Sequence, residues 1–252
     1  MARLGHARRH TTFASIITLA AAAALLSPLA LMSAWVFAKS LPMQIYSTAV
    51  GEIRRIVLDE WISLRMNTAS AASVTLDDQL CEVGLDRGEA LFEVERESPR
   101  PLRVIVGDRV MNARAAKFSV RVRDAKNMEL LVSTGQVTVG TTLVGEHQWV
   151  RISPDGLRLR DLNPAEIARR LEWTNGHLTF AGETLAEAAA EFNRYNARKL
   201  VIADRAISFI PIGGKFLVSD VQSFVAALRP LGVRAVGADK NPIQLVGARG
   251  AN

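Results

Sequence analysis

The sequence has very little cysteine and histidine, and this scarcity excludes several kinds of site. Cys81 is the only cysteine among 252 residues, so the chain has neither an internal disulfide nor a CxxC pair for a metal or redox centre. The four histidines lack the spacing of metal ligands. We therefore predict no metal and no cofactor, and we expect Cys81 to be a small buried strand residue.

The sequence also lacks a nucleic-acid-binding motif. Its formal net charge is +6, but the lysines and arginines are scattered along the chain, and part of the excess lies within the first ten residues. A basic patch on one face would be needed for nucleic acid, and nothing in the pattern indicates one. We predict no nucleic-acid partner.

No catalytic pair is recognisable, although one segment at first suggests a hydrolase. The stretch from Asp86 to Val104 contains four glutamates, namely Glu89, Glu93, Glu95 and Glu97. In a strand, side chains alternate between the two faces, so the glutamates and Leu91 share one face while Ala90, Phe92 and Val94 share the other. We interpret the glutamates as a solvent-facing row and predict that the protein is not an enzyme.

One long segment carries no charge at all. Residues 11–38 are long enough to cross a bilayer as a helix, and the arginines of the tail at residues 1–10 place the N-terminus in the cytoplasm. The alternative is a signal peptide that is cleaved before Lys39. In both interpretations, the rest of the chain is exported.

Residues 41–154 have the pattern of an all-β domain. Apolar residues recur at every second position in short runs separated by turn-forming residues, including RRIVL, SVTL, ALFEVE, LRVIV, KFSVRV, LLVSTGQVTV and QWVRI. We predict a sandwich-like all-β domain, or a barrel, of about nine strands that ends near Pro154. Gly88 suits a bulge that needs a positive φ, and Asn67 suits a turn that its own side chain holds.

These strands also carry a family resemblance. The segments YSTAVGEIRRIVL, MNTAS, LDRGEALFEVE and RPLRVIVGDRVMNARAAKFSVRV resemble, in this order, the periplasmic domain of FecR-type regulators. The resemblance covers roughly residues 46–139. It implies a single-pass inner-membrane protein with a periplasmic C-terminal region. It also implies a signalling role in iron–siderophore uptake, in which the protein relays ligand occupancy of an outer-membrane TonB-dependent transporter to an extracytoplasmic-function sigma factor.

The sequence departs from the family pattern in three places. The family carries a cytoplasmic anti-sigma domain before the membrane segment, and here ten residues precede it. Three interpretations are open: a truncated gene model, a divergent member that lost the domain, or a partner that works through a separate anti-sigma chain. Asp59-Glu60-Trp61 stands where an Asp-Gly-Ser turn is common, which implies an altered loop. Ala115-Ala116 replaces the Gly-Thr bond at which some members cleave themselves, and alanine has no hydroxyl nucleophile. We expect no self-cleavage.

Residues 155–252 change to a mixed pattern of strand, helix and strand, repeated once. The first helix, TLAEAAAEFNRYN, has a Thr184/Glu187 capping box and an apolar stripe, and the second, SDVQSFVAALRPL, has Ser219 and Gln222 as its predicted capping pair. Strands are expected at HLTF, KLVIA, IPIGGKF, VRAVGA and IQLVG. This small α+β domain is similar to the secretin and TonB N-terminal domain.

The C-terminal domain has two interpretations at its first helix. In one, Phe192 and Tyr195 lie in the core while Asn193, Arg194 and Asn196 form a solvated face. In the other, this helix face or an adjoining strand edge docks the signalling domain of the transporter. We place the predicted partner-binding residues at Asn193, Arg194, Tyr195, Lys215 and Phe216. A rival hypothesis is a periplasmic envelope-binding or structural module without sigma-factor control.

Overall fold

The computed structural model describes residues 42–237 and 240–248. The predicted cytoplasmic tail and membrane helix, residues 1–10 and 11–38, lie outside the described residues. No helix within the described ranges is long and apolar enough to span a membrane. The described residues from Met43 onward form one compact unit.

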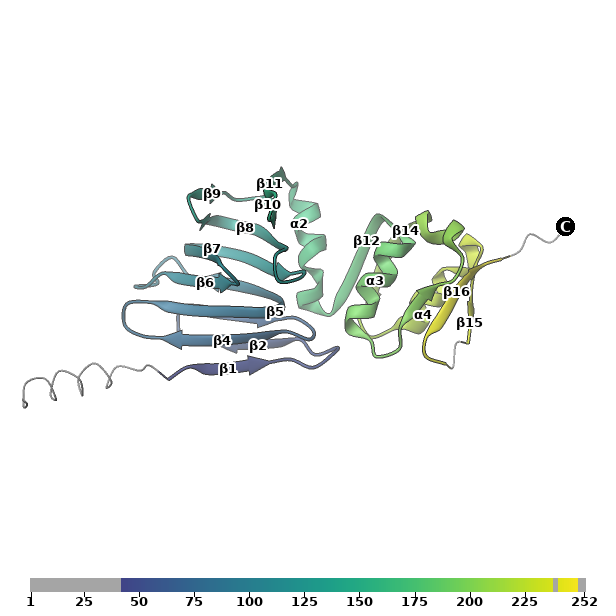
Figure 1. Cartoon of the computed structure of the whole chain (residues 1–252), viewed down its shortest axis with the longest axis horizontal. Helices are drawn as coiled ribbons and strands as arrows, with labels where there is room; N and C mark the ends of the chain where they lie inside the picture. The colour runs from purple at the N-terminus through teal and green to yellow at the C-terminus, as the bar shows by residue number, and fades with distance from the viewer. Residues whose placement is uncertain (1–41, 238–239, 249–252) are drawn as a thin grey trace, which may run out of the picture. The chain divides into compact units, whose positions relative to one another are not determined.

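The first part of this unit is an 11-stranded sheet, shown in purple to teal in Figure 1. Its strands are β1 (Gln44–Ser47), β2 (Arg54–Val57), β3 (Ile62–Met66), β4 (Ala71–Leu76), β5 (Cys81–Val94), β6 (Leu102–Val106), β7 (Arg109–Val122), β8 (Met128–Val139), β9 (Thr142–Val144), β10 (Gln148–Ser153) and β11 (Gly156–Asp161). The strand-rich class predicted from the alternating pattern is confirmed.

The two long strands β5 and β7 organise this sheet. The first half of β5 pairs with β4 and, in parallel, with β6, whereas its second half pairs with β3 and β7. The inward side chains of all these strands form one core, in which the Phe92 and Phe118 rings stack with centroids 5.1 Å apart. Ala90, Phe92 and Val94 face this core, as the alternation predicts.

The prediction that the β-domain ends near Pro154 is wrong, because the sheet continues beyond it. Pro154 lies in the turn between β10 and β11, where its missing N–H removes no ladder hydrogen bond. The last strand, β11, ends at Asp161 and is mostly exposed. The segment GLRLRD does alternate leucine with arginine, but the sequence prediction ended the β-domain at the Pro154 turn and assigned no strand to this segment.

The second part of the unit contains helices and two small sheets, drawn in green to yellow in Figure 1. Its elements are α2 (Pro164–Leu171), η1 (Glu172–Asn175), β12 (His177–Thr184), α3 (Leu185–Tyr195), β13 (Leu200–Ile202), η2 (Arg205–Phe209), β14 (Pro211–Leu217), α4 (Val221–Ala227), η3 (Arg229–Leu231), β15 (Val233–Val236) and β16 (Ile243–Gly247). One sheet is β12–β14 and the other is β13–β16–β15. The predicted order of strands and helices is confirmed, and α2 is an additional helix.

Capping residues define where the two main helices of this part begin. The Thr184/Glu187 box of α3 is present: Glu187 N donates to Thr184 Oγ1 over 3.2 Å, and Thr184 N donates to Glu187 Oε2 over 2.8 Å. The prediction for α4 is wrong by one residue, because Asp220 is the cap and accepts from Ser223 N at 2.9 Å. A carboxylate beside the positive helix end is a stronger acceptor than a serine hydroxyl.

Two local predictions in the sheet are also confirmed. Gly88 has φ +86° beside a bulge at the start of the β4–β5 pairing. The turn at residues 59–61 closes without a positive φ, because Asp59 Oδ1 accepts from both Trp61 N and Ile62 N at 2.7 Å. A side-chain-held turn replaces the glycine turn of the resemblance.

Candidate functional site

The C-terminal domain covers part of the outer face of the sheet. Leu91 of β5 and Leu131 of β8 point away from the first core and belong instead to the second core, together with the apolar stripe of α3. Glu89, two residues before Leu91 on the same face, is 7% exposed. The prediction that the glutamates line the solvent face is therefore wrong for Glu89, because a second domain replaces solvent there. It holds for Glu95 and Glu97, which are exposed, while Glu93 is half-buried against Lys117.

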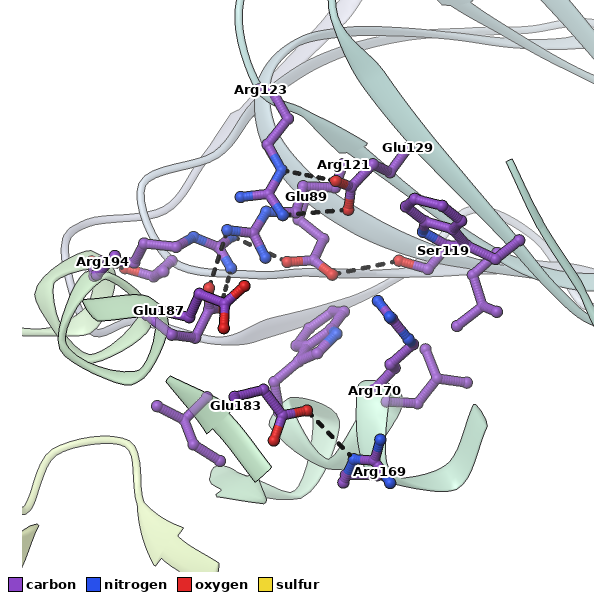
Figure 2. A pocket seen from close by; sticks show the side chains of 18 of the residues that line it. Glu89, Ser119, Arg121, Arg123, Glu129, Arg169, Arg170, Glu183, Glu187 and Arg194 are labelled. Atoms are coloured by element: carbon purple, nitrogen blue, oxygen red, sulfur yellow. Dashed lines mark hydrogen bonds and ion pairs between the residues drawn. The ribbon is translucent and has the colours of Figure 1, made fainter. Parts of the chain in front are cut away.

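Four side chains clasp the two domains together around Glu89. Glu89 Oε2 accepts from Arg194 Nη2 of α3 and from Asn67 Nδ2, each at 2.9 Å. Asn67 Nδ2 also donates to Tyr195 Oη at 2.8 Å. We call Asn67, Glu89, Arg194 and Tyr195 the domain clasp, and Figure 2 shows the Glu89 and Arg194 side chains pointing toward one another.

A second acidic residue extends the clasp along α3. Glu191 accepts from Arg121 Nη2 of β7 at 2.9 Å and also pairs with Arg194. Burial alone would raise the pKa of Glu191, but the Arg194 and Arg121 guanidinium groups outweigh it and hold the pKa below its ordinary value. Arg194 therefore connects two carboxylates, one from each domain.

Burial and charge also perturb the cationic and phenolic members of the clasp. Burial raises the pKa of Tyr195, and the neighbouring Glu89 carboxylate raises it further. Burial would lower the pKa of Arg194, but Glu89 and Glu191 together raise it above its ordinary value. Tyr195 is therefore a neutral acceptor for Asn67, and Arg194 is a permanent cation.

The turn at Asn67 positions this network from the sheet side. Asn67 is fully buried, and its Oδ1 accepts from Thr68 N at 2.8 Å, which confirms the predicted side-chain-held turn. Thr68 Oγ1 in turn donates to the Arg194 carbonyl at 3.1 Å. Sequence reasoning found the turn but missed its contact with α3, because the two are far apart in the chain.

The structure does not bring all five predicted partner-binding residues together. Arg194 and Tyr195 are in the clasp, so the interpretation of Arg194 as a solvated residue is wrong. Asn193 instead forms two hydrogen bonds with Leu200 of β13. Its Nδ2 donates to the Leu200 carbonyl at 2.8 Å, and its Oδ1 accepts from Leu200 N at 2.7 Å. Its neighbour Asn196 donates to the Val218 carbonyl at 2.8 Å and is likewise not a purely solvated residue.

The other two predicted residues lie on β14. The Phe216 ring packs edge-on against Phe224 at 5.3 Å and against Phe192 at 6.0 Å, so its role is mainly structural. The Lys215 side chain is 51% exposed and pairs with Glu172. Among the described strands β14 pairs with β12 alone, so its second edge is open, and Leu217 at its end is half exposed.

A pocket of about 790 Å³ lies beside the clasp, between the outer face of the sheet and the elements α2, β12 and α3. Seven arginines and five glutamates line it, together with Trp149, Trp173 and His177. In Figure 2 the labelled charged side chains reach the pocket from three sides: Arg121, Arg123 and Glu129 from the sheet at the top, Glu187 and Arg194 from α3 at the left, and Arg169 and Arg170 from α2 below. Sequence reasoning did not find this pocket, because its arginines come from strands and helices spread over some seventy positions.

The dipeptide Ala115-Ala116 has an unusual backbone at its first residue. Ala115 has φ +49°, although it is not a glycine, and a Cβ placed on the facing Gly135 would lie 2.2 Å from the Ala115 carbonyl oxygen. Ser119 lies on the regular β5–β7 ladder opposite Leu91. Ala115 therefore has a left-handed backbone, and neither residue of the dipeptide has a hydroxyl group.

Comparison with known proteins agrees with this architecture. Residues 44–138 match the family model described as FecR protein. Two crystal structures of a proposed anti-sigma factor from Parabacteroides distasonis ATCC 8503, at 1.65 and 2.50 Å resolution, resemble the chain with a TM-score of 0.66 and 17% identity, over 82% of this chain and 100% of theirs. No curated protein matches the chain. At that identity the crystal structures establish the fold alone. The family match establishes that residues 44–138 are a FecR domain.

Proposed function

We propose that this protein is a membrane-anchored periplasmic signalling regulator that relays the occupancy of an outer-membrane TonB-dependent transporter to an extracytoplasmic-function sigma factor. The observation that carries the proposal is the FecR domain at residues 44–138, followed by an α+β domain. The likeness to a proposed anti-sigma factor over 82% of the chain supports the same class of regulator rather than an enzyme. Iron–siderophore uptake is the process that the family suggests.

We place the transporter-binding surface at the open edge of β14 rather than on α3. Arg194 and Tyr195 of α3 already serve the domain clasp, so a partner there would have to displace buried ion pairs. The β14 edge needs no such displacement. A strand of the partner can pair with its free backbone groups, and Lys215 and Leu217 are half-exposed side chains beside it.

The test is a pull-down of the detergent-solubilised full chain with the signalling domains of the TonB-dependent transporters from the same genome. We expect one such domain to be captured, and we expect Leu217→Ser to weaken capture. Leu159→Ser is the matched control, because Leu159 is a similarly exposed strand leucine on β11. Capture of no transporter domain, together with binding to isolated cell envelope, would favour the envelope-binding hypothesis instead.

The proposed location is the inner membrane, with the N-terminus cytoplasmic and the region after the anchor periplasmic. Its support is the uncharged run at residues 11–38 and the arginines before it. Cell fractionation should recover the intact chain from the inner membrane. A soluble form that begins at Lys39 would show that the segment is a cleaved signal peptide.

A further inference from the structure

The pocket beside the clasp has more positive than negative groups available to a ligand. The glutamates of its lining already have hydrogen-bond or ion-pair partners. Glu89 and Glu191 pair with the clasp cations, and Glu187 belongs to the α3 capping box. Glu129 pairs with Arg123, whose Nε and Nη2 donate to its two carboxylate oxygens at 3.0 and 3.2 Å. Glu183 lies 3.7 Å from Arg169 Nε. Among these lining carboxylates Glu187 alone has no cationic partner, because the groups of the α3 cap that it contacts are uncharged.

Arg170, in contrast, is a cation without an anionic partner. It forms no ion pair with any carboxylate that the structure describes, and its guanidinium lies over the Trp149 ring, 5.4 Å from the centroid. Arg151 lies over the same ring at the same distance, and its Nη2 is 3.8 Å from Glu129. Stacking uses the face of a guanidinium and leaves its in-plane N–H donors free.

Two buried polar atoms of the same lining are also without partners. The Trp173 side chain is almost fully buried, and its indole Nε1–H has no hydrogen-bond acceptor among the described residues. The Thr179 hydroxyl is likewise unpartnered within the described part of the chain. Buried polar groups of folded proteins are nearly always satisfied, and an indole N–H can only donate. The missing partner of Trp173 must therefore be an acceptor.

We propose that this pocket binds a small organic oxyanion, through carboxylate or phosphate oxygens that accept from Arg170, Arg151 and the Trp173 indole. Guanidinium groups offer paired donors that match both kinds of oxyanion, and Trp149 holds the two arginines in place. The volume of about 790 Å³ lies within the range of small-molecule sites, roughly 300–1,000 Å³. The site is independent of the transporter-binding edge at β14.

The test uses the full chain in detergent and phosphate-free buffer at low ionic strength, where charge recognition is strongest. Isothermal titration calorimetry would compare glutarate, pyrophosphate and the neutral analogue glutaramide. We expect saturable binding of one molecule of glutarate or pyrophosphate per chain and no binding of glutaramide. The anion that binds more tightly identifies carboxylate or phosphate as the recognised group.

Matched arginine variants locate the binding. Arg170→Gln should weaken binding about tenfold or more, since it removes charge-assisted donors. Arg158→Gln makes the same charge change on the exposed strand β11, outside the pocket lining, and should leave affinity unchanged. Arg158→Gln should keep the unfolding temperature of the parent chain, and Arg170→Gln should lower it only slightly, because the exposed Arg170 side chain loses its stacking contact with Trp149. Absence of saturable binding, equal binding of glutaramide, or equal weakening by Arg158→Gln would each overturn the proposal.

Discussion

Replacing Arg194 with methionine removes the cation of the domain clasp while keeping a similar apolar stem. Glu89 is 7% exposed, so the variant would leave a nearly buried carboxylate without its ion-pair partner. Removing one member of a buried ion pair costs about 3–5 kcal/mol of unfolding free energy. Two features reduce this value: the Arg194 side chain is 20% exposed, and Asn67 still donates to Glu89. We expect a loss of about 2–4 kcal/mol.

The assay is urea unfolding of the full chain in detergent, followed by tryptophan fluorescence. The matched control is Arg103→Met, because Arg103 forms a cross-strand pair with Glu82 at 3.4 Å, and both side chains are well exposed. That surface pair should contribute about 0–1 kcal/mol. A cycle with Glu89→Gln should show a coupling of about 1–3 kcal/mol between positions 89 and 194. If Arg194→Met costs no more than Arg103→Met, the clasp does not hold the domains together.

Acidification provides a second measure of the same network. The pKa of Glu191 is lowered in the folded state, so its contribution is fully present above the unfolded pKa of about 4.3 and is lost as pH falls through the lower folded value. The parent chain should therefore lose stability as the pH falls below about 4.3. Arg194→Met should lose less over that range, because one of the two cations that lower the pKa of Glu191 is gone. An unchanged acid dependence would contradict the assignment.

Three further predictions concern single positions in the sheet. Gly88→Ala should destabilise the fold by at least about 2 kcal/mol in urea unfolding, because Gly88 has φ +86° and the added Cβ would lie 2.2 Å from Ser70 Oγ. The control is Gly156→Ala, because Gly156 also has a positive φ but an added Cβ there would meet no atom within 4 Å. Cys81 should resist a thiol reagent at pH 8 until urea is added, since burial raises its pKa to about 12; rapid labelling of the native chain would refute this. The purified chain should remain intact on prolonged incubation, because Ala115-Ala116 has no hydroxyl; fragments that meet at that bond, detected by intact-mass measurement, would show another cleavage chemistry.

Local patterns were sufficient for most of the secondary structure. The apolar stripe of α3 and its Thr184/Glu187 box depend on residues within one or two turns, so the sequence predicted both correctly. Alternation placed Phe92 in the first core for the same reason. The α4 cap was misassigned where two good capping residues, Ser219 and Asp220, are adjacent and only the geometry decides between them. Strand β11 was missed although GLRLRD alternates, because the predicted domain boundary was placed at the Pro154 turn, which proved to be a hairpin turn within the sheet.

By itself the sequence determined the strand-rich class of the first domain, the order of the predicted strands and helices in the second, and the resemblance to FecR-type proteins, all of which depend on short-range patterns. Only the tertiary structure decided the role of Glu89. Alternation placed its side chain correctly on the outer face of β5, but whether that face meets water or α3 depends on contacts between residues about a hundred positions apart. The same holds for the arginine-lined pocket, whose side chains come from separate strands and helices. Burial and charge pairing depend on which residues the folded chain brings together, and no local period in a sequence specifies that.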